Sequence, residues 1–207
     1  MITNLAITER FILGPEQNGI VMTPEEFDAV EDYDDNYGYE LIHGVLIVNP
    51  VPSAEETGPN EYLGHQLLRY RENHPQGSAL DFTLPEQYVR TPDGRRRADR
   101  LIWAGLGRMP KIMVDVPAIA IEFVSSGKKS FTRDYVEKRQ EYLALGIAEY
   151  WIIDRFRRIM TVYRGGTQAS SEIVVEESQT YETPLLPGFQ VPLAQLLTLA
   201  AQIAQAQ

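Results

Sequence analysis

The feature that most constrains this chain is a glutamate inside an otherwise apolar run. Glu122 lies in PAIAIEFVSS, residues 117–126, where small and β-branched residues predict a buried strand. A buried carboxylate costs on the order of several kcal/mol unless a cation or hydrogen-bond donors compensate it. A second acid, Asp99, stands at the start of the apolar part of RRRADRLIW, residues 95–103. We therefore expect the fold to bring a compensating group to both carboxylates.

Alternation along the strand predicts which side chains share a face with Glu122. Ala120 and Val124 fall on the same side as Glu122, whereas Ile119 and Ile121 fall on the other. If the strand of Asp99 is the neighbouring strand, the two carboxylates converge at one end of the sheet. Two carboxylates with a backbone carbonyl and waters suit Mg²⁺, with Mn²⁺ as the alternative. The sequence thus predicts a carboxylate-built metal site that activates water and neutralises charge on a phosphate.

The helix expected after this strand adds a cation. Its apolar stripe has the 4, 3, 4, 3 spacing of an amphipathic helix and consists of Phe131, Tyr135, Lys138, Tyr142 and Leu145. Lys138 is the only charged member of the stripe. A lysine that leans toward the carboxylates can orient a water or offset charge in a transition state. The alternative is that Lys138 lies along apolar surface with its ammonium in water.

Composition places the chain among ordinary globular proteins. At 207 residues, with 43% apolar and 23% charged residues, it suits one domain spanning 1–207. There is no cysteine, which excludes disulfides, thiolate metal sites and a cysteine nucleophile. No run of about 18 apolar residues is present to span a membrane. The N-terminal sequence is too polar for a signal peptide, so we expect a cytoplasmic protein.

The distribution of charge modifies what the net charge of −10 suggests. Residues 90–164 hold 16 of the 19 Lys and Arg but only 9 of the 29 Asp and Glu. Such asymmetry within one chain indicates a polyanionic partner, even though the total is acidic. The alternative is a mixed solvated surface without a partner.

Turn residues and hydrophobic periodicity predict strands interleaved with a few helices, hence an α/β fold with a mixed sheet flanked by helices. Neither an internal repeat nor a clear domain boundary is visible. We expect helices over 23–36, 59–73, 131–146 and 192–205. The expected strands cover 37–50 with a turn at His43-Gly44, 78–90 with a break at Pro85, 98–105, 117–124, 148–166 with a turn at 154–157, and 171–177.

Several motifs occur in an order that resembles one protein family. They are YELI-x-G, then R-x-x-D at a strand start, IEFVS, DY-x-EKR-x-x-Y and G-x-x-EYWIID. In this order they resemble the putative restriction endonuclease family of the PD-(D/E)XK nuclease superfamily, which is abundant in cyanobacteria. The resemblance covers about residues 37–164, which we take as the core, with the helix over 192–205 as an addition.

The resemblance implies a restriction-endonuclease-like fold and a role for each motif residue. Asp99 corresponds to the first acid of the motif and Glu122 to the second, both as metal ligands. Two positions depart from the pattern. Ala98 replaces the usual proline, and Val124 stands where the lysine normally follows the second acid. Lys138 would then be a migrated lysine, with Lys128 and Lys129 as the other candidates.

The resemblance also implies a further acid from the first core helix. Glu61 is the first candidate, and Glu40 is the second, although Glu40 also suits a structural role in a strand. Other polar residues have simpler interpretations. His43, His65 and His74 lack metal-ligand spacing, Asp154 suits turn chemistry, and the aromatic residues of EYWIID suit the core.

Three functions remain open at this point. The first is a Mg²⁺-dependent DNA endonuclease that uses Asp99, Glu122, Lys138 and Glu61, with Arg95–Arg97 in a basic turn contacting phosphates. The second is a catalytically weak or inactive nuclease-fold domain that binds nucleic acid or a protein partner. The third is a structural module with surface carboxylates at strand ends. The resemblance and the apolar C-terminal helix also suggest a homodimer.

Overall fold

The computed structural model describes residues 12–127, 132–165 and 171–206. Backbone contacts divide the chain into two compact units. Unit 1 comprises the described residues up to Val51 together with Pro92–Arg95, and unit 2 comprises Pro52–Thr91 and the described residues from Arg96 onward. The organisation of the whole chain as one domain stays a prediction. Among the residues described, no helix combines the length and apolarity that crossing a membrane requires.

Unit 1 begins with two short helices, and the second of them, α1, has the predicted start signal. Helix α1 opens with a capping box, in which the Glu26 amide donates to Thr23 Oγ1 at 3.1 Å and Glu26 Oε2 accepts from the Thr23 amide at 2.7 Å. The helix ends at Asp28, so the expected helix over 23–36 is wrong in length. The elements of this unit are η1 (Pro15–Gln17), α1 (Pro24–Asp28), β1 (Tyr37–Ile42) and β2 (Val45–Pro50).

The hairpin in unit 1 has the predicted turn. His43 and Gly44 both have positive φ, 48° and 75°, which is the backbone of a type I′ hairpin turn. Strands β1 and β2 pair in antiparallel register from Ile42 opposite Val45 outward. Leu41 also pairs with Arg95, at the start of β4 (Gly94–Ala104).

Unit 2 begins with α2 (Ala54–Asn73), which starts earlier than the sequence indicated. We expected a loop up to residue 59, but Ser53 and Glu56 cap the helix, with the Ser53 amide donating to Glu56 Oε2 at 2.9 Å. Pro59 lies inside the helix, where a missing amide hydrogen costs one hydrogen bond without breaking the helix. The prediction failed because the segment up to Pro59 was interpreted as a Pro-rich loop, whereas Pro59 lies in the second turn of the helix.

The strands of unit 2 form the predicted mixed sheet. Strands β3 and β4 form a hairpin, β4 and β5 are antiparallel, and β5 and β6 are parallel. Strands β6, β7 and β8 continue as an antiparallel meander. Their bounds are β3 (Leu80–Thr91), β5 (Ile119–Phe123), β6 (Glu149–Asp154), β7 (Ile159–Arg164) and β8 (Ser171–Glu176), with the short helix η2 (Gly77–Ala79) before β3.

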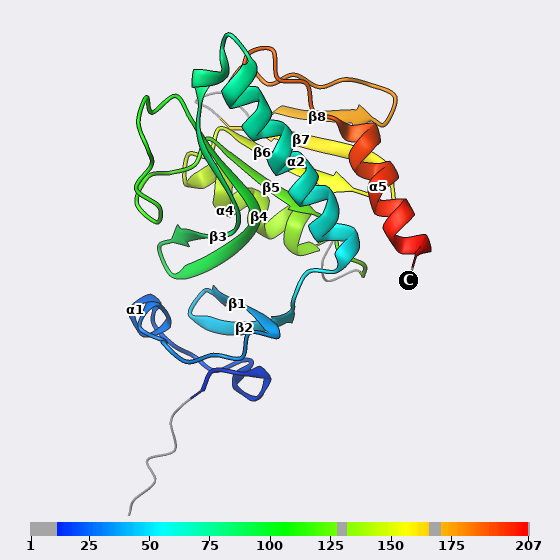
Figure 1. Ribbon diagram of the computed structural model, residues 1–207. Helices are drawn as coiled ribbons and strands as arrows, with labels where there is room; N and C mark the ends of the chain where they lie inside the picture. The colour runs from blue at the N-terminus through cyan, green and yellow to red at the C-terminus, as the bar shows by residue number, and fades with distance from the viewer. Residues whose placement is uncertain (1–11, 128–131, 166–170, 207) are drawn as a thin grey trace, which may run out of the picture. The chain divides into compact units, whose positions relative to one another are not determined.

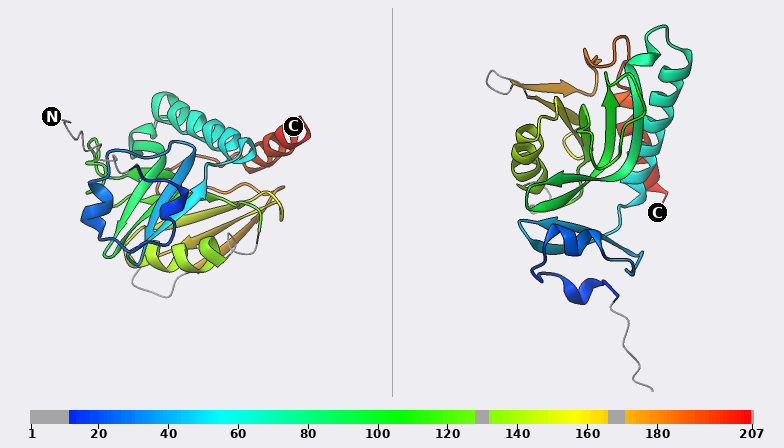
Figure 2. Two further views of the ribbon diagram at one scale, coloured as in Figure 1. Left: turned by 90° about the horizontal axis from the view of Figure 1, so that it is seen from below. Right: turned by 90° about the vertical axis from the view of Figure 1, so that its left-hand side faces the viewer.

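Helices cover both faces of this sheet (Figures 1 and 2). On one face α2 and α5 (Leu193–Gln205) lie side by side, and their leucines pack against Ile119, Ile121 and Phe123 of β5. On the other face, Tyr135 and Tyr142 pack against Ala120 and Val124. The predicted alternation is therefore confirmed for residues 119–124, and Glu122 points toward the second face; Ala118, before the strand, packs on the first face instead.

The second face is covered by one helical segment with an irregular start. Residues Arg133–Lys138 form a π-helix, η3, which continues directly into α4 (Arg139–Ala144). The segment ends before Gly146, whose φ of 89° is left-handed as predicted for a helix stop. π-helical turns are rare but occur frequently at functional sites, and this one was not predictable from the sequence.

Candidate functional site

The register between β4 and β5 places the two predicted carboxylates side by side. Arg100 is paired with Ile121, so continuing the ladder by one step puts Asp99 opposite Glu122. Residues opposite each other in an antiparallel pair point to the same face. At this position the interaction between the two strands involves a side chain. The Phe123 amide donates a hydrogen bond to Asp99 Oδ2 at 2.6 Å.

Lys138 reaches the carboxylates from the helical segment. Its Nζ lies 2.9 Å from Glu122 Oε2 and donates to the Arg97 carbonyl oxygen at 2.6 Å. Lys138 and Glu122 are each only 2% exposed, so the alternative that the ammonium lies in water is wrong. The hydroxyl of Tyr142 donates to Glu122 Oε1 at 3.4 Å. Asp99, Glu122 and Lys138 thus converge from β4, β5 and η3.

Negative charge exceeds positive charge at this place. Burial raises the pKa of Asp99 to about 7, with Lys138 lowering it and Glu86 and Asp134 raising it. Burial also raises the pKa of Glu122 well above its usual range, and Lys138 only partly offsets this. Electrostatic repulsion from Asp99 raises the pKa of Glu122 further. A divalent cation would relieve both effects.

The donor set fits a hard cation that takes few protein ligands. Among residues 12–127, 132–165 and 171–206, no three His, Asp or Glu side chains gather closely enough to hold a metal ion by themselves. Mg²⁺ is commonly held by one or two carboxylates and keeps several waters. Asp99 and Glu122 supply two such carboxylates, so the residues fit Mg²⁺ better than a metal that needs a full protein cage.

The position that usually carries the lysine is apolar in the structure as well. Val124 is 5% exposed and packs with Tyr135 and Tyr142. The ammonium beside Glu122 comes instead from Lys138, four residues before Tyr142 on the same helical face. The other two candidate lysines, Lys128 and Lys129, lie outside the described residues.

The structure does not bring Glu61 to these three residues. Its side chain is 65% exposed, and Oε1 lies 3.8 Å from the guanidinium of Arg100. Arg100 points to the α2 face of the sheet, where it donates to Asn60 Oδ1 at 2.7 Å, and not to the face of Glu122. Glu40 belongs to unit 1, is buried, and accepts from Asn49 Nδ2 at 3.4 Å, as a structural acid in a strand would.

Two other acids, which were not predicted from the sequence, act on the site. Glu86 on β3 interacts electrostatically with Asp99 and Lys138. Asp134, in η3, is fully buried beside Arg133 and raises the pKa of both strand carboxylates. Asp134 adjoins Tyr135 of the predicted stripe, which is the one signal that could have indicated it.

The three consecutive arginines are not a solvent-exposed basic turn, contrary to our expectation. They lie in β4, because the hairpin turn is at Pro92-Asp93. Within unit 1, Arg95 makes a two-point contact with Asp28, with distances of 2.8 and 2.7 Å. Arg96 is fully buried and donates through Nε to Glu141 at 2.7 Å. Only Arg97, whose side chain is 27% exposed and pairs with Glu86, remains suited to contact a phosphate.

The simpler interpretations of other polar residues hold. Asp154 Oδ1 accepts from the amides of Phe156 and Arg157 at 3.0 and 2.9 Å, as in an Asx turn. His43 pairs with Asp93 at 2.8 Å in unit 1, and His74 stacks on Tyr70. The aromatic residues of β6 are buried in the core.

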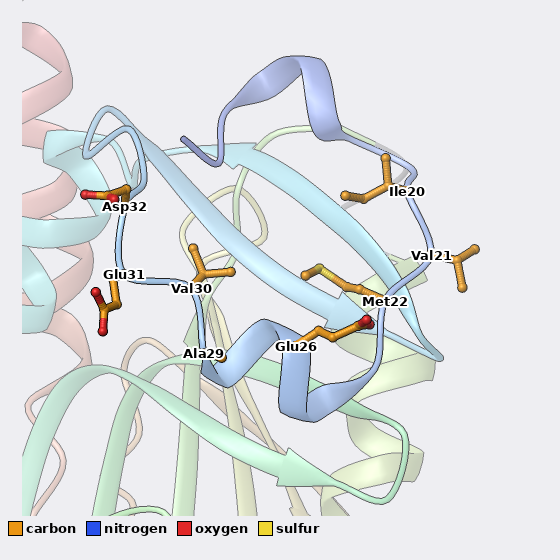
Figure 3. A pocket seen from close by; sticks show the side chains of 8 residues that line it. All are labelled: Ile20, Val21, Met22, Glu26, Ala29, Val30, Glu31 and Asp32. Carbon is orange, nitrogen blue, oxygen red and sulfur yellow. The ribbon is translucent and has the colours of Figure 1, made fainter. Parts of the chain in front are cut away.

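Unit 1 contains a hollow of about 460 Å³, which is open to solvent (Figure 3). Its lining combines apolar side chains with three carboxylates, and it holds no lysine, arginine or nucleophile. Glu26 is already engaged in the α1 cap. The hollow therefore lacks the cation that the candidate site has; it is lined by Ile20, Val21, Met22, Glu26, Ala29, Val30, Glu31 and Asp32.

Comparison with known proteins identifies the family of the chain. The family model of Uma2, described as a putative restriction endonuclease, matches residues 24–199. The chain belongs to this family. The match includes β4, β5 and η3, so the putative restriction endonuclease family covers all three elements that carry the candidate site. A search of curated proteins finds no match.

A solved structure shows that the fold is shared. The crystal structure of a putative nuclease belonging to DUF820 from Anabaena variabilis matches with a TM-score of 0.68 at 17% sequence identity. The match covers 86% of this chain and 99% of that chain. At this identity the similarity establishes the fold, and the predicted restriction-endonuclease-like mixed sheet with flanking helices is confirmed.

Proposed function

We propose that this member of the putative restriction endonuclease family is a metal-dependent endonuclease that hydrolyses DNA phosphodiester bonds. The observation that carries the proposal is the 2.9 Å contact between Lys138 Nζ and Glu122 Oε2, beside Asp99, in a family described by that activity. Each of these residues is costly to bury alone. Their convergence from three separate elements favours a built site over scattered surface acids.

The proposed roles follow from charge and burial. Asp99 and Glu122 would hold Mg²⁺, or Mn²⁺, which when bound lowers the pKa of a water and neutralises charge on a phosphate. The Arg97 carbonyl and Glu122 hold the Lys138 ammonium in place. From there the ammonium can donate a hydrogen bond to a water or a phosphate oxygen. Tyr142 fixes the other oxygen of Glu122.

A second candidate is a nuclease-fold domain that binds nucleic acid or a protein partner without efficient cleavage. It is favoured by Val124, which occupies the usual lysine position and is buried in the core. It is also favoured by the two acceptors that already engage the Lys138 ammonium. DNA as partner is supported by the excess of Lys and Arg over residues 90–164. A homodimer, the assembly expected from the sequence, stays a proposal under either function.

Cleavage of plasmid DNA by purified variants tests the proposal. We expect wild-type protein to nick DNA when Mg²⁺ or Mn²⁺ is present and not in EDTA. Asp99→Asn and Glu122→Gln should lower the rate by at least about a hundredfold while leaving circular dichroism unchanged. Glu61→Gln is the matched control and should keep wild-type activity, because Glu61 pairs with Arg100 on the other face.

Lys138→Met separates the two candidate functions. In a nuclease it should abolish cleavage and leave DNA binding in EDTA within a few fold of the wild-type value. Full cleavage by Asp99→Asn or Glu122→Gln would overturn the assignment. Salt-sensitive binding by the wild-type protein with no cleavage in either metal would support the second candidate instead.

A further inference from the structure

Arg97 lies two residues before Asp99 in β4, so their Cα atoms are about 7 Å apart. The backbone of Arg97 already belongs to the candidate site, since its carbonyl oxygen accepts from Lys138 at 2.6 Å. Its side chain is 27% exposed, so the guanidinium can contact a ligand from solvent.

Glu86 meets this guanidinium because of an irregularity in β3. Phe82 and Leu84 pack on the same core cluster as Val89, although a regular strand would place even and odd positions on opposite faces. One residue is therefore out of step between Leu84 and Val89. Glu86, with a φ of 52°, has the left-handed backbone typical of such a β-bulge. Bulges redirect side chains and occur often beside active sites.

The bulge brings the Glu86 carboxylate to Arg97, with 3.0 Å between Oε2 and Nε. The charge of Glu86 is only partly compensated by Arg97. Burial raises the pKa of Glu86, and Arg97 lowers it without cancelling the effect. Glu86 also raises the pKa of Asp99, so it adds negative charge near the carboxylates of the candidate site. An ion pair of this kind exchanges partners at little cost.

Carboxylate and phosphate bind a guanidinium in the same planar, two-point geometry. We propose that Arg97 binds a phosphate of the DNA backbone next to the scissile bond, and that Glu86 occupies this position until DNA displaces it. The inference rests on the proposed function for its ligand. It adds a residue for positioning the substrate and a carboxylate that competes with the substrate.

DNA affinity in EDTA tests the inference, because the two partners should act in opposite directions. Binding of a labelled duplex is measured by fluorescence anisotropy over a range of salt concentrations. Arg97→Gln should weaken binding and reduce the slope of log K against log salt by about one. Glu86→Gln should strengthen binding by about two- to fivefold, which corresponds to the modest strength of a partly exposed ion pair. The double variant should bind like Arg97→Gln.

Glu177→Gln is the matched control, because it also removes one negative charge from a pair with an arginine, Arg158. Its affinity should stay within about twofold of wild type. Equal strengthening by Glu177→Gln and Glu86→Gln would reduce the effect to net charge and overturn the inference. Weaker binding by Glu86→Gln in a folded protein would overturn it too, by showing that the pair is structural. A wild-type protein without salt-sensitive binding would instead remove DNA as the ligand and so contradict the proposed function itself.

Discussion

Asp99 and Glu122 share one buried ammonium, so their face of the sheet holds more negative charge than positive. This imbalance has a cost in the metal-free protein. A carboxyl whose pKa is raised by folding retains its proton in the folded state after the unfolded chain has lost it. The stability of the metal-free protein should therefore depend on pH through Asp99.

We expect wild-type protein in EDTA to lose stability as the pH rises from about 4 to about 7. The folded-state pKa of Asp99 is about 7, above the usual value of about 3.9, so in this interval the folded state binds more protons than the unfolded state. Asp99→Asn cannot titrate, and its free energy of unfolding should fall less, by on the order of 2 kcal/mol. Urea unfolding at pH 5 and pH 8 gives both values. Parallel pH dependence in the two proteins would show that Asp99 is ionised normally.

At the residue scale, the site residues that could be predicted were charged residues within otherwise apolar patterns. Glu122 and Asp99 stood in apolar strands, and Lys138 was the one charge on an apolar stripe. No local pattern indicated Glu86, because its position depends on a bulge that arises from the pairing of β3 with β4. The interaction partner of Arg96 was also not predictable, because Glu141 is distant from it in the sequence.

At the scale of elements, helix boundaries and helix partners were the least predictable. The apolar stripe of α5 could have covered either the core or a second subunit, because burial requires only an apolar surface. In the structure Leu193, Leu196 and Leu197 are buried in the same core cluster as Leu63 and Leu67 of α2. The stripe on α5 is thus accounted for within the protomer and gives no support to a homodimer.

Truncation of one of these leucines should destabilise the protein without altering the candidate site. Leu197→Ala removes a side chain that is 1% exposed and should lower the free energy of unfolding by about 3 kcal/mol. Thr198→Ala, on the exposed side of the same helix, is the control and should change it by less than about 0.5 kcal/mol. Urea unfolding measures both. Equal stability of the two variants would mean that α5 does not dock on the core.

At the scale of the whole molecule, the two units differ in the charge of their residues. Residues 11–51 contain nine Asp and Glu and no Lys or Arg, whereas most of the basic residues belong to unit 2. A polyanion is therefore expected to contact unit 2, where Arg97 and the candidate site lie. Composition predicted this asymmetry, but not that two of the three consecutive arginines are committed to internal ion pairs.

We propose above all that Asp99 and Glu122 together bind one divalent cation on this face of unit 2. Titration of metal-free protein with Mn²⁺ at pH 8, followed by electron paramagnetic resonance, tests it directly. We expect one saturable site in the wild-type protein and in Glu61→Gln, and at least about tenfold weaker binding in Asp99→Asn and in Glu122→Gln. Binding should also weaken below about pH 7, as Asp99 becomes protonated. Wild-type affinity in both carboxylate variants would contradict the account.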